Sequence, residues 1–133
     1  MTQYFLITGA RDWPESHAHI ITDLLDSHLR WHPDSTMLNG MCPTGADKIA
    51  YEWAVANGVP VEKHYADWAG KGRSAGPQRN TAMVNRLLDE GSSIAFAFFY
   101  GPKNASRGTM NTYRTLVARG VEPIERQLDY VQV

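Results

Sequence analysis

The sequence predicts an α/β domain built on a mainly parallel five-stranded sheet. The first observation is that short apolar runs of strand length alternate with longer amphipathic segments along the 133 residues, a pattern typical of parallel α/β sheets. The second is that residues 94–99, within an expected strand at 93–99, are all apolar, as in a central strand covered on both faces. The length fits one hydrophobic core. We therefore expect a single Rossmann-like three-layer α/β/α domain over residues 1–133.

The expected strands are short apolar runs, and the first of them stops at Gly9. They cover residues 4–8, 36–39, 61–65, 93–99 and 121–125. Residues 126–133 carry no clear pattern and are expected to form an irregular tail. The stretch 66–76 is rich in glycine and is expected to be an irregular loop.

The helices are expected where apolar residues recur at 3.6-residue spacing. They cover residues 14–31 or 16–31, 46–57, 77–91 and 108–119. Pro77 suits the first helical position, and Gly91 and the Asn57-Gly58 pair suit helix ends. His28 lies on the apolar face of the first helix, which indicates a core histidine rather than a ligand.

Composition narrows the class of function. Charged residues make up 20% of the chain and the net charge is -1, so contacts to phosphate or nucleic acid must come from local clustering. Cys42 is the only cysteine, which excludes an internal disulfide and suits a reducing compartment. The apolar run at 94–100 is too short to cross a bilayer. We expect a cytoplasmic protein without membrane contact, and the five histidines show no zinc-like pairing with Cys42.

Ligands of an open parallel sheet bind beyond the carboxyl ends of its strands. Four segments at that end hold nearly all the unusual residues of this chain, at 8–13, 39–47, 67–80 and 106–109. Their glycines let the backbone approach a ligand closely, and the adjoining helix N-termini present free N–H groups to phosphate. The glycines concerned are Gly9, Gly40, Gly45 and Gly108.

Three arginines in these segments are candidates for phosphate binding. Arg79 and Arg107 lie at or beside predicted helix starts, where a cation opposes the helix dipole by about 0.3–1 kcal/mol and an anion would reverse that cost. Arg11 follows the Gly9 turn directly. The alternative for Arg79 and Arg107 is a surface ion pair, or a helix that starts one turn away from the predicted position. The alternative for Arg11 is an ion pair with Asp12 or Asp47.

Other side chains in the same segments have two interpretations each. Asp47 is either the acidic member of a capping-box variant that begins at Thr44, or a partner for ribose hydroxyls. Asn80 contacts either a ligand or the neighbouring loops. Trp13 and Trp68 lie in expected loops, where each ring either stacks on a base or closes the core from its edge.

Taken together, these segments resemble the YspA-type branch of the SLOG superfamily, which also contains the lonely-guy phosphoribohydrolases and DprA. The resemblance is carried by ITGARDW at 7–13, GADK at 45–48, ADW at 66–68, AGPQRN at 75–80 with Met83, and SRGT at 106–109. It implies a Rossmann-like fold and a nucleotide-derived ligand. It places these residues around that ligand: Gly9, Arg11, Gly40, Gly45, Asp47, Arg79, Asn80, Gly108 and Thr109.

Two departures from the family's pattern bear on catalysis. The second loop usually reads His-Gly, whereas this chain has Asn39-Gly40, which removes an acid/base group. The phosphoribohydrolases carry a glutamate where this chain has Thr112, and threonine cannot serve as a general base. Hydrolysis of that type would need Asp47 or Glu52 instead, and Asp47 is the better candidate.

Three functions follow as hypotheses. The first is binding of a phosphorylated, nucleotide-derived ligand such as a nucleoside phosphate or an ADP-ribose-like molecule, with no other cofactor implied. The second is a hydrolase that cleaves an N-glycosidic or phosphate bond in such a ligand. The third is single-stranded nucleic-acid binding, as in DprA. The basic residues of the 71–79 loop and the tryptophans expected in loops support it. The resemblance also implies a homodimer.

Overall fold

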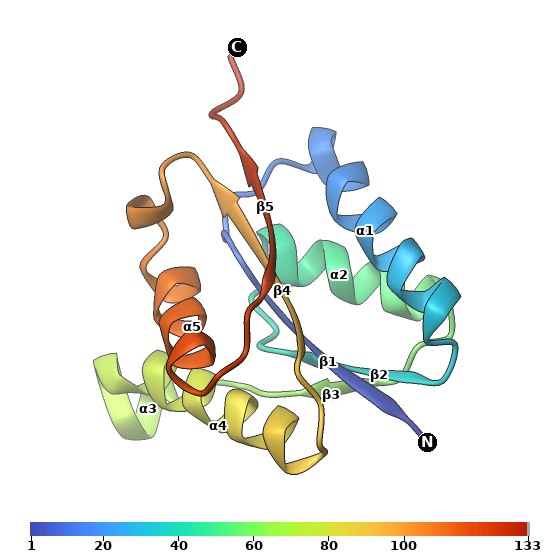
Figure 1. The fold of residues 1–133 in the computed structure, drawn as a ribbon. Coiled ribbons are helices and arrows are strands. Elements are labelled where there is room, and N and C mark those ends of the chain that lie inside the picture. Colours follow the sequence, from blue (N-terminus) through green and yellow to red (C-terminus); the bar gives the residue numbers. More distant parts are fainter. Residues whose placement is uncertain (133) are drawn as a thin grey trace.

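The computed structural model describes residues 1–132 and contains a five-stranded sheet in which all neighbouring strands run parallel. The strand order is β3-β2-β1-β4-β5 (Figure 1). The strands are β1 (Gln3–Gly9), β2 (Ser35–Asn39), β3 (Val61–Lys63), β4 (Ile94–Tyr100) and β5 (Ile124–Leu128). The expected α/β class and parallel sheet are confirmed.

Four long helices cover the two faces of the sheet. Figure 1 shows α1 (Ala18–Trp31) and α2 (Gly45–Ala56) on one face and α4 (Ala75–Asp89) and α5 (Arg107–Ala118) on the other. A 3-10 turn at Glu15–His17 leads into α1. The arrangement is the expected Rossmann-like three-layer sandwich.

Alternation along the strands divides the core between the two faces. Phe5 and Ile7 of β1 pack in the cluster beneath α1 and α2, while Leu6 packs in the cluster beneath α4 and α5. Strand β4 is buried on both faces over residues 95–99. This confirms the prediction that its apolar run forms a central strand. Parallel strands between two helix layers require this pattern.

His28 is a core residue, as predicted. Its side chain is 7% exposed, packs on Phe5 and Phe96, and has Nε2 3.1 Å from Oγ of Ser35. Burial lowers the pKa of His28 to about 4, and the positive charge of nearby His32 lowers it further in the same direction. The imidazole is therefore neutral at physiological pH.

Two expectations about the middle of the chain are wrong. The stretch 66–76 is not irregular, because α3 (Trp68–Lys71) and a 3-10 turn at Gly72–Ser74 form there. Oδ1 of Asp67 accepts a hydrogen bond from the Gly70 N–H at 3.0 Å and caps α3. Helix α4 then starts at Ala75 rather than at Pro77, since the preceding turns feed directly into it.

The last strand also begins later than predicted. Val121 is buried in the cluster of α4 and α5, so its apolar side chain anchors the turn after α5 rather than opening a strand. Strand β5 starts at Ile124 and pairs Arg126 with Phe98, so the predicted tail from Arg126 is partly wrong. Residues 129–132 have no regular structure, and Val133 lies outside the described residues.

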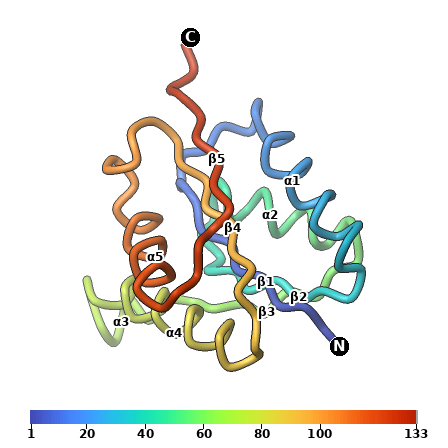
Figure 2. Tube along the Cα trace, in the orientation of Figure 1, coloured from blue at the N-terminus to red at the C-terminus, as the bar shows by residue number. Residues whose placement is uncertain are grey.

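The topology leaves an opening at the carboxyl end of the sheet. The chain runs outward from β1 to β3 on one side and then crosses to β4 on the other side of β1. Loops after β1 and β4 therefore diverge to opposite faces, which is where doubly wound folds place their ligands. In Figure 2 the N-terminus lies at the opposite end of the sheet from this opening. No helix among residues 1–132 is long and apolar enough to cross a membrane.

Candidate functional site

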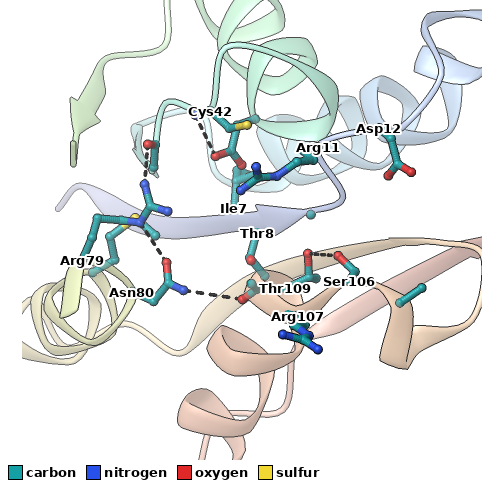
Figure 3. A pocket seen from close by; sticks show the side chains of 16 residues that line it. Ile7, Thr8, Arg11, Asp12, Cys42, Arg79, Asn80, Ser106, Arg107 and Thr109 are labelled. Carbon is teal, nitrogen blue, oxygen red and sulfur yellow. Dashed lines mark hydrogen bonds between the residues drawn. The ribbon is translucent and has the colours of Figure 1, made fainter. Parts of the chain in front are cut away.

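A hollow of about 470 Å³ lies at the carboxyl end of the sheet, where β1, β2, α4 and α5 meet (Figure 3). Its volume is in the range of small-molecule sites. Nine of the twelve predicted site residues line it. They are Gly9, Arg11, Gly40, Asp47, Arg79, Asn80, Arg107, Gly108 and Thr109.

A second hollow of about 590 Å³ adjoins the first and shares part of its lining with it. The shared residues are Arg11, Arg79, Asn80, Arg107 and Gly108. Trp68, which the sequence placed in the site, lines only the second hollow. The ring is 56% exposed at the first position of α3.

Protein atoms accept hydrogen bonds from Nη1 and Nε of Arg79, which lines both hollows. Its Nη1 donates to the carbonyl of Gly40 at 2.6 Å and more weakly to that of His64 at 3.4 Å, and its Nε donates to Asn80 at 2.8 Å. A Cβ on Gly40 would lie 2.8 Å from Nη1, so glycine makes room for the guanidinium. Because α4 starts at Ala75, Arg79 lies in its second turn, and the helix-dipole argument for Arg79 is wrong.

Arg11 and Arg107 differ from Arg79 in being exposed and unpaired. Arg107 is the first residue of α5, next to the predicted start. Within residues 1–132 neither side chain forms an ion pair, so Arg11 does not bridge to Asp12 or Asp47. Both line the shared part of the two hollows, where an anion would compensate their charge.

The N-terminus of α5 adds partial positive charge at the same place. Its first helical hydrogen bond runs from the Met110 N–H to the carbonyl of Ser106 at 2.9 Å, so the amides of residues 107–109 have no partner inside the helix. Oγ of Ser106 donates to Oγ1 of Thr109 at 2.7 Å. Residues 106–109 line the first hollow (Figure 3), and a helix N-terminus at such a place is suited to phosphate.

Asp47 is a buried carboxylate that borders the first hollow. It is 8% exposed, and its Oδ2 accepts a hydrogen bond from the Cys42 N–H at 3.2 Å. Burial raises the pKa of Asp47 to about 6, although that hydrogen bond and the charges of Arg79 and Arg11 act in the opposite direction. The expected capping box is wrong, since Oγ1 of Thr44 donates to the Arg11 carbonyl at 2.7 Å and caps nothing.

Two predicted site residues are structural. Trp13 is 2% exposed, packs edge-on against Phe98 at 5.9 Å and donates Nε1–H to the His17 carbonyl at 3.0 Å, so of its two interpretations the one that places the ring in the core is correct. Gly45 has φ +73, and a Cβ there would lie 2.3 Å from the Ala10 carbonyl oxygen. Gly45 therefore lets α2 start directly against the first loop.

The positions that departed from the family's pattern are also packed into the protein. Asn39 is fully buried, accepts from the Met41 N–H at 2.7 Å and donates to the Asp47 carbonyl at 3.0 Å. Thr112 is fully buried and donates to the Gly108 carbonyl at 3.2 Å. Neither residue borders the hollows, so neither takes the place of the histidine or glutamate that the family's pattern has at these positions.

Asn80 contacts helix α5 rather than the neighbouring loops, and it also borders both hollows. Its Nδ2 lies 3.2 Å from Oδ1 of Asn111 and 3.5 Å from the Gly108 carbonyl. This contact ties α4 to α5 at the floor of the site. Asn111 and Arg114, which sequence reasoning missed, line the second hollow. Their spacing of four and seven residues from Arg107 was the available signal, because it places all three on one helix face.

Comparison with known proteins identifies a family model and a relative. The family model YAcAr, described as the YspA, cpYpsA-related SLOG family, matches residues 5–70. This range includes Arg11 and Asp47, and it ends before Arg79 and Arg107. The Gene 61 protein of Mycobacterium phage D29 is 32% identical over 124 residues, which are 90% of this chain and 92% of that protein.

No solved structure is significantly similar to the chain. The family model covers the first two βα units of the fold and the phage relative extends the likeness over nearly the whole chain. The chain therefore belongs to the YspA, cpYpsA-related SLOG family.

Proposed function

We propose that the chain binds a phosphorylated, nucleotide-derived ligand at the first hollow. Membership of the SLOG family associates the chain with nucleotide-related ligand binding or processing in general. The observation that carries the proposal is the convergence of Arg11, Arg107 and the free amides of α5 on one hollow, with no ion pair to either arginine within residues 1–132. Arginines without an ion-pair partner in a concave site favour an anion.

Each polar group has a separate role in this proposal. The guanidinium groups of Arg11 and Arg107 and the amides of 107–109 bind phosphate oxygens. Arg79 positions the wall of the site, since its Nη1 and Nε are occupied by protein acceptors. Asp47 accepts hydrogen bonds from sugar hydroxyls, because Oδ2 has only the Cys42 N–H as a partner.

The test is calorimetric titration of nucleoside mono-, di- and triphosphates into the wild type and into Arg11→Ala and Arg107→Ala. A hydrogen bond to a charged group contributes about 1.5–3 kcal/mol, so each variant should bind about ten-fold or more weakly. Arg30→Ala is the matched control, because Arg30 is exposed in the last turn of α1 and borders neither hollow. Unchanged affinity in both site variants would contradict the proposal.

A second candidate function is hydrolysis of the same ligand. It is favoured by one observation, the buried carboxyl of Asp47 with a pKa raised to about 6 beside the hollow. At neutral pH this carboxylate would take a proton from an attacking water. Incubation with nucleoside phosphates followed by chromatography should then release base or phosphate in the wild type and not in Asp47→Asn, whereas no release from the wild type excludes this function for those substrates.

A nucleic-acid ligand is distinguished in the same titrations. A single-stranded oligonucleotide that bound through these arginines would lose affinity steeply as salt increases, with a slope of about -0.7 per phosphate contact. The proposed small ligand would make few phosphate contacts and show a shallow slope. Tight, steeply salt-dependent oligonucleotide binding without nucleotide binding would replace the small-molecule proposal.

A further inference from the structure

We propose that Tyr130, in the tail that follows β5, is a positioning residue for the candidate site. Its ring holds the segment 101–106, which joins β4 to α5 and borders both hollows. Asn104 of this segment lines the second hollow, and Ala105 and Ser106 line the first. The inference deepens the proposed function and rests on it, because its effect on affinity requires a ligand in the hollows.

The segment 101–106 has little regular structure of its own. Pro102, Asn104 and Ala105 are exposed, and a 3-10 turn at Lys103–Ala105 is its one helical element. A backbone hydrogen bond of this turn runs from the Ala105 N–H to the Pro102 carbonyl at 2.9 Å. A short exposed segment of this kind opens at little cost unless other parts of the chain hold it.

Strand β5 holds the segment at Gly101. The Gly101 N–H donates to the Leu128 carbonyl at 2.8 Å, and the Gly101 carbonyl accepts from Nε2 of Gln127 at 2.9 Å. Farther along the segment, Lys103 forms an ion pair with Glu125. Figure 1 shows the end of β5 beside the loop that follows β4. The tail that continues from β5 therefore starts next to this segment.

Tyr130 packs directly on Gly101. The glycine has φ +74, and a Cβ there would lie 2.3 Å from Cζ of the tyrosine, so the ring occupies the space that any other side chain would need. The ring also meets that of Tyr100 edge-on, with 5.0 Å between centroids. The Tyr100 hydroxyl accepts a hydrogen bond from the Val131 N–H at 2.9 Å. The tail is thus anchored at two neighbouring residues, although Tyr130 is 53% exposed.

The course of this segment matters for binding because it leads into the N-terminus of α5. Oγ of Ser106 donates to Oγ1 of Thr109 at 2.7 Å, and Arg107 is the first residue of the helix. A segment that is mobile in the free protein must be ordered when a ligand binds, and this ordering lowers affinity. A tail that orders the segment beforehand removes the loss.

The first test measures amide hydrogen exchange without ligand in the wild type, Tyr130→Ala and Tyr130→Phe. In Tyr130→Ala the amides of Gly101 and Ala105, which are hydrogen-bonded in the folded protein, should exchange about ten-fold faster, the effect of losing one aromatic pair. Tyr130→Phe keeps the ring and should exchange like the wild type. Tyr65→Ala is the matched control, because Tyr65 is 68% exposed and borders neither hollow.

The second test titrates AMP, ADP and ATP into the same four proteins. Tyr130→Ala should bind the preferred nucleotide about five- to ten-fold more weakly, because the ligand must now order the segment. Tyr130→Phe and Tyr65→Ala should bind like the wild type. The midpoint of urea unfolding should change little in Tyr130→Ala, because Tyr130 lies outside both core clusters of residues 1–132. A purely structural role would instead lower that midpoint and leave the affinity unchanged.

The two tests separate this inference from the proposed function. Unchanged exchange or unchanged affinity in Tyr130→Ala would overturn the positioning role, and so would a Tyr130→Phe protein as impaired as Tyr130→Ala. If the wild type binds no nucleoside phosphate, the proposed function fails, and the role of Tyr130 in binding fails with it. The exchange rates then still decide whether the ring holds the segment.

Discussion

Asp47 makes the folding stability of this protein depend on pH in an unusual direction. Burial raises the pKa of its carboxyl from 3.8 to about 6, so the folded state holds this proton more tightly than the unfolded chain. The stability contributed by the protonated form is fully present below pH 3.8 and is lost as the pH rises through 6. Replacing Asp47 with Asn, a neutral side chain of the same shape, removes this loss.

The size of the effect follows from the shift. One pKa unit corresponds to about 1.4 kcal/mol, so the free energy of unfolding lost between acidic and neutral pH is about 3 kcal/mol. Asparagine can still accept the hydrogen bond from the Cys42 N–H through Oδ1. Asp47→Asn should therefore match the wild type at pH 4 and exceed it by about 3 kcal/mol at pH 7.

Urea denaturation of both proteins at pH 4, 5, 6, 7 and 8 measures this difference directly. The difference must grow over the window from 4 to 6 and stay constant above 7. Gly58→Ala is the control, because it changes no titratable group and a Cβ there would meet nothing within 4 Å; its difference from the wild type should stay flat over the same pH range. A difference that does not change with pH, or an Asp47→Asn protein that is less stable at pH 7, would refute the reasoning.

Five further substitutions, in the core and around the site, make four predictions that urea denaturation tests. His28→Gln should gain about 3 kcal/mol on the wild type as pH falls from 6.5 to 4, because the pKa of His28 is lowered to about 4 and its stability contribution is lost on acidification; a flat difference contradicts this. Gly45→Ala should lower the free energy of unfolding by about 3 kcal/mol, because its Cβ would meet the Ala10 carbonyl oxygen. Gly58→Ala, whose Cβ would meet nothing within 4 Å, should lower it by only about 1 kcal/mol. Equal losses in the two variants would contradict the close approach of Gly45 to Ala10. Trp13→Ala should cost about 3–5 kcal/mol, and a loss under about 1 kcal/mol would place the ring outside the core. Arg79→Ala should lower the free energy of unfolding by about 2 kcal/mol through its lost contact to the Gly40 carbonyl, and an unchanged stability would contradict a structural role for that contact.

The sequence predicted the architecture well because hydrophobic periodicity reports directly on burial. The strands and long helices fall near their expected positions, and the apolar run of β4 lies at the centre of the sheet. The errors lie where local signals compete. Val121 is as apolar as a strand residue, but it packs beneath α5, and the glycines near Gly70 hide the short helix α3.

For the candidate site, the sequence predicted which residues lie near the hollow better than it predicted what each side chain contacts. Parallel topology brings Arg11, the start of α2 with Asp47 and the start of α5 with Arg107 to one hollow, and the order of the strands and helices alone indicates this. The partners of each side chain are not visible in the sequence. Arg79 turns inward to backbone carbonyls 15 and 39 residues away. Trp13 turns into the core. The sequence does not reveal this, because only the packed structure decides which aromatic side chain of a loop is covered.

The most direct test of the central claim is to locate the phosphate by amide chemical shifts in a ¹⁵N-labelled protein. We predict that ADP shifts the amides of Arg107, Gly108 and Thr109 and the side-chain Nε of Arg11, because these residues line the first hollow. Amides at the opposite end of the sheet, such as that of Ser92, should not move. Shifts that are confined to other surfaces, or no shifts with any nucleoside phosphate, would contradict a nucleotide site at the carboxyl end of this sheet.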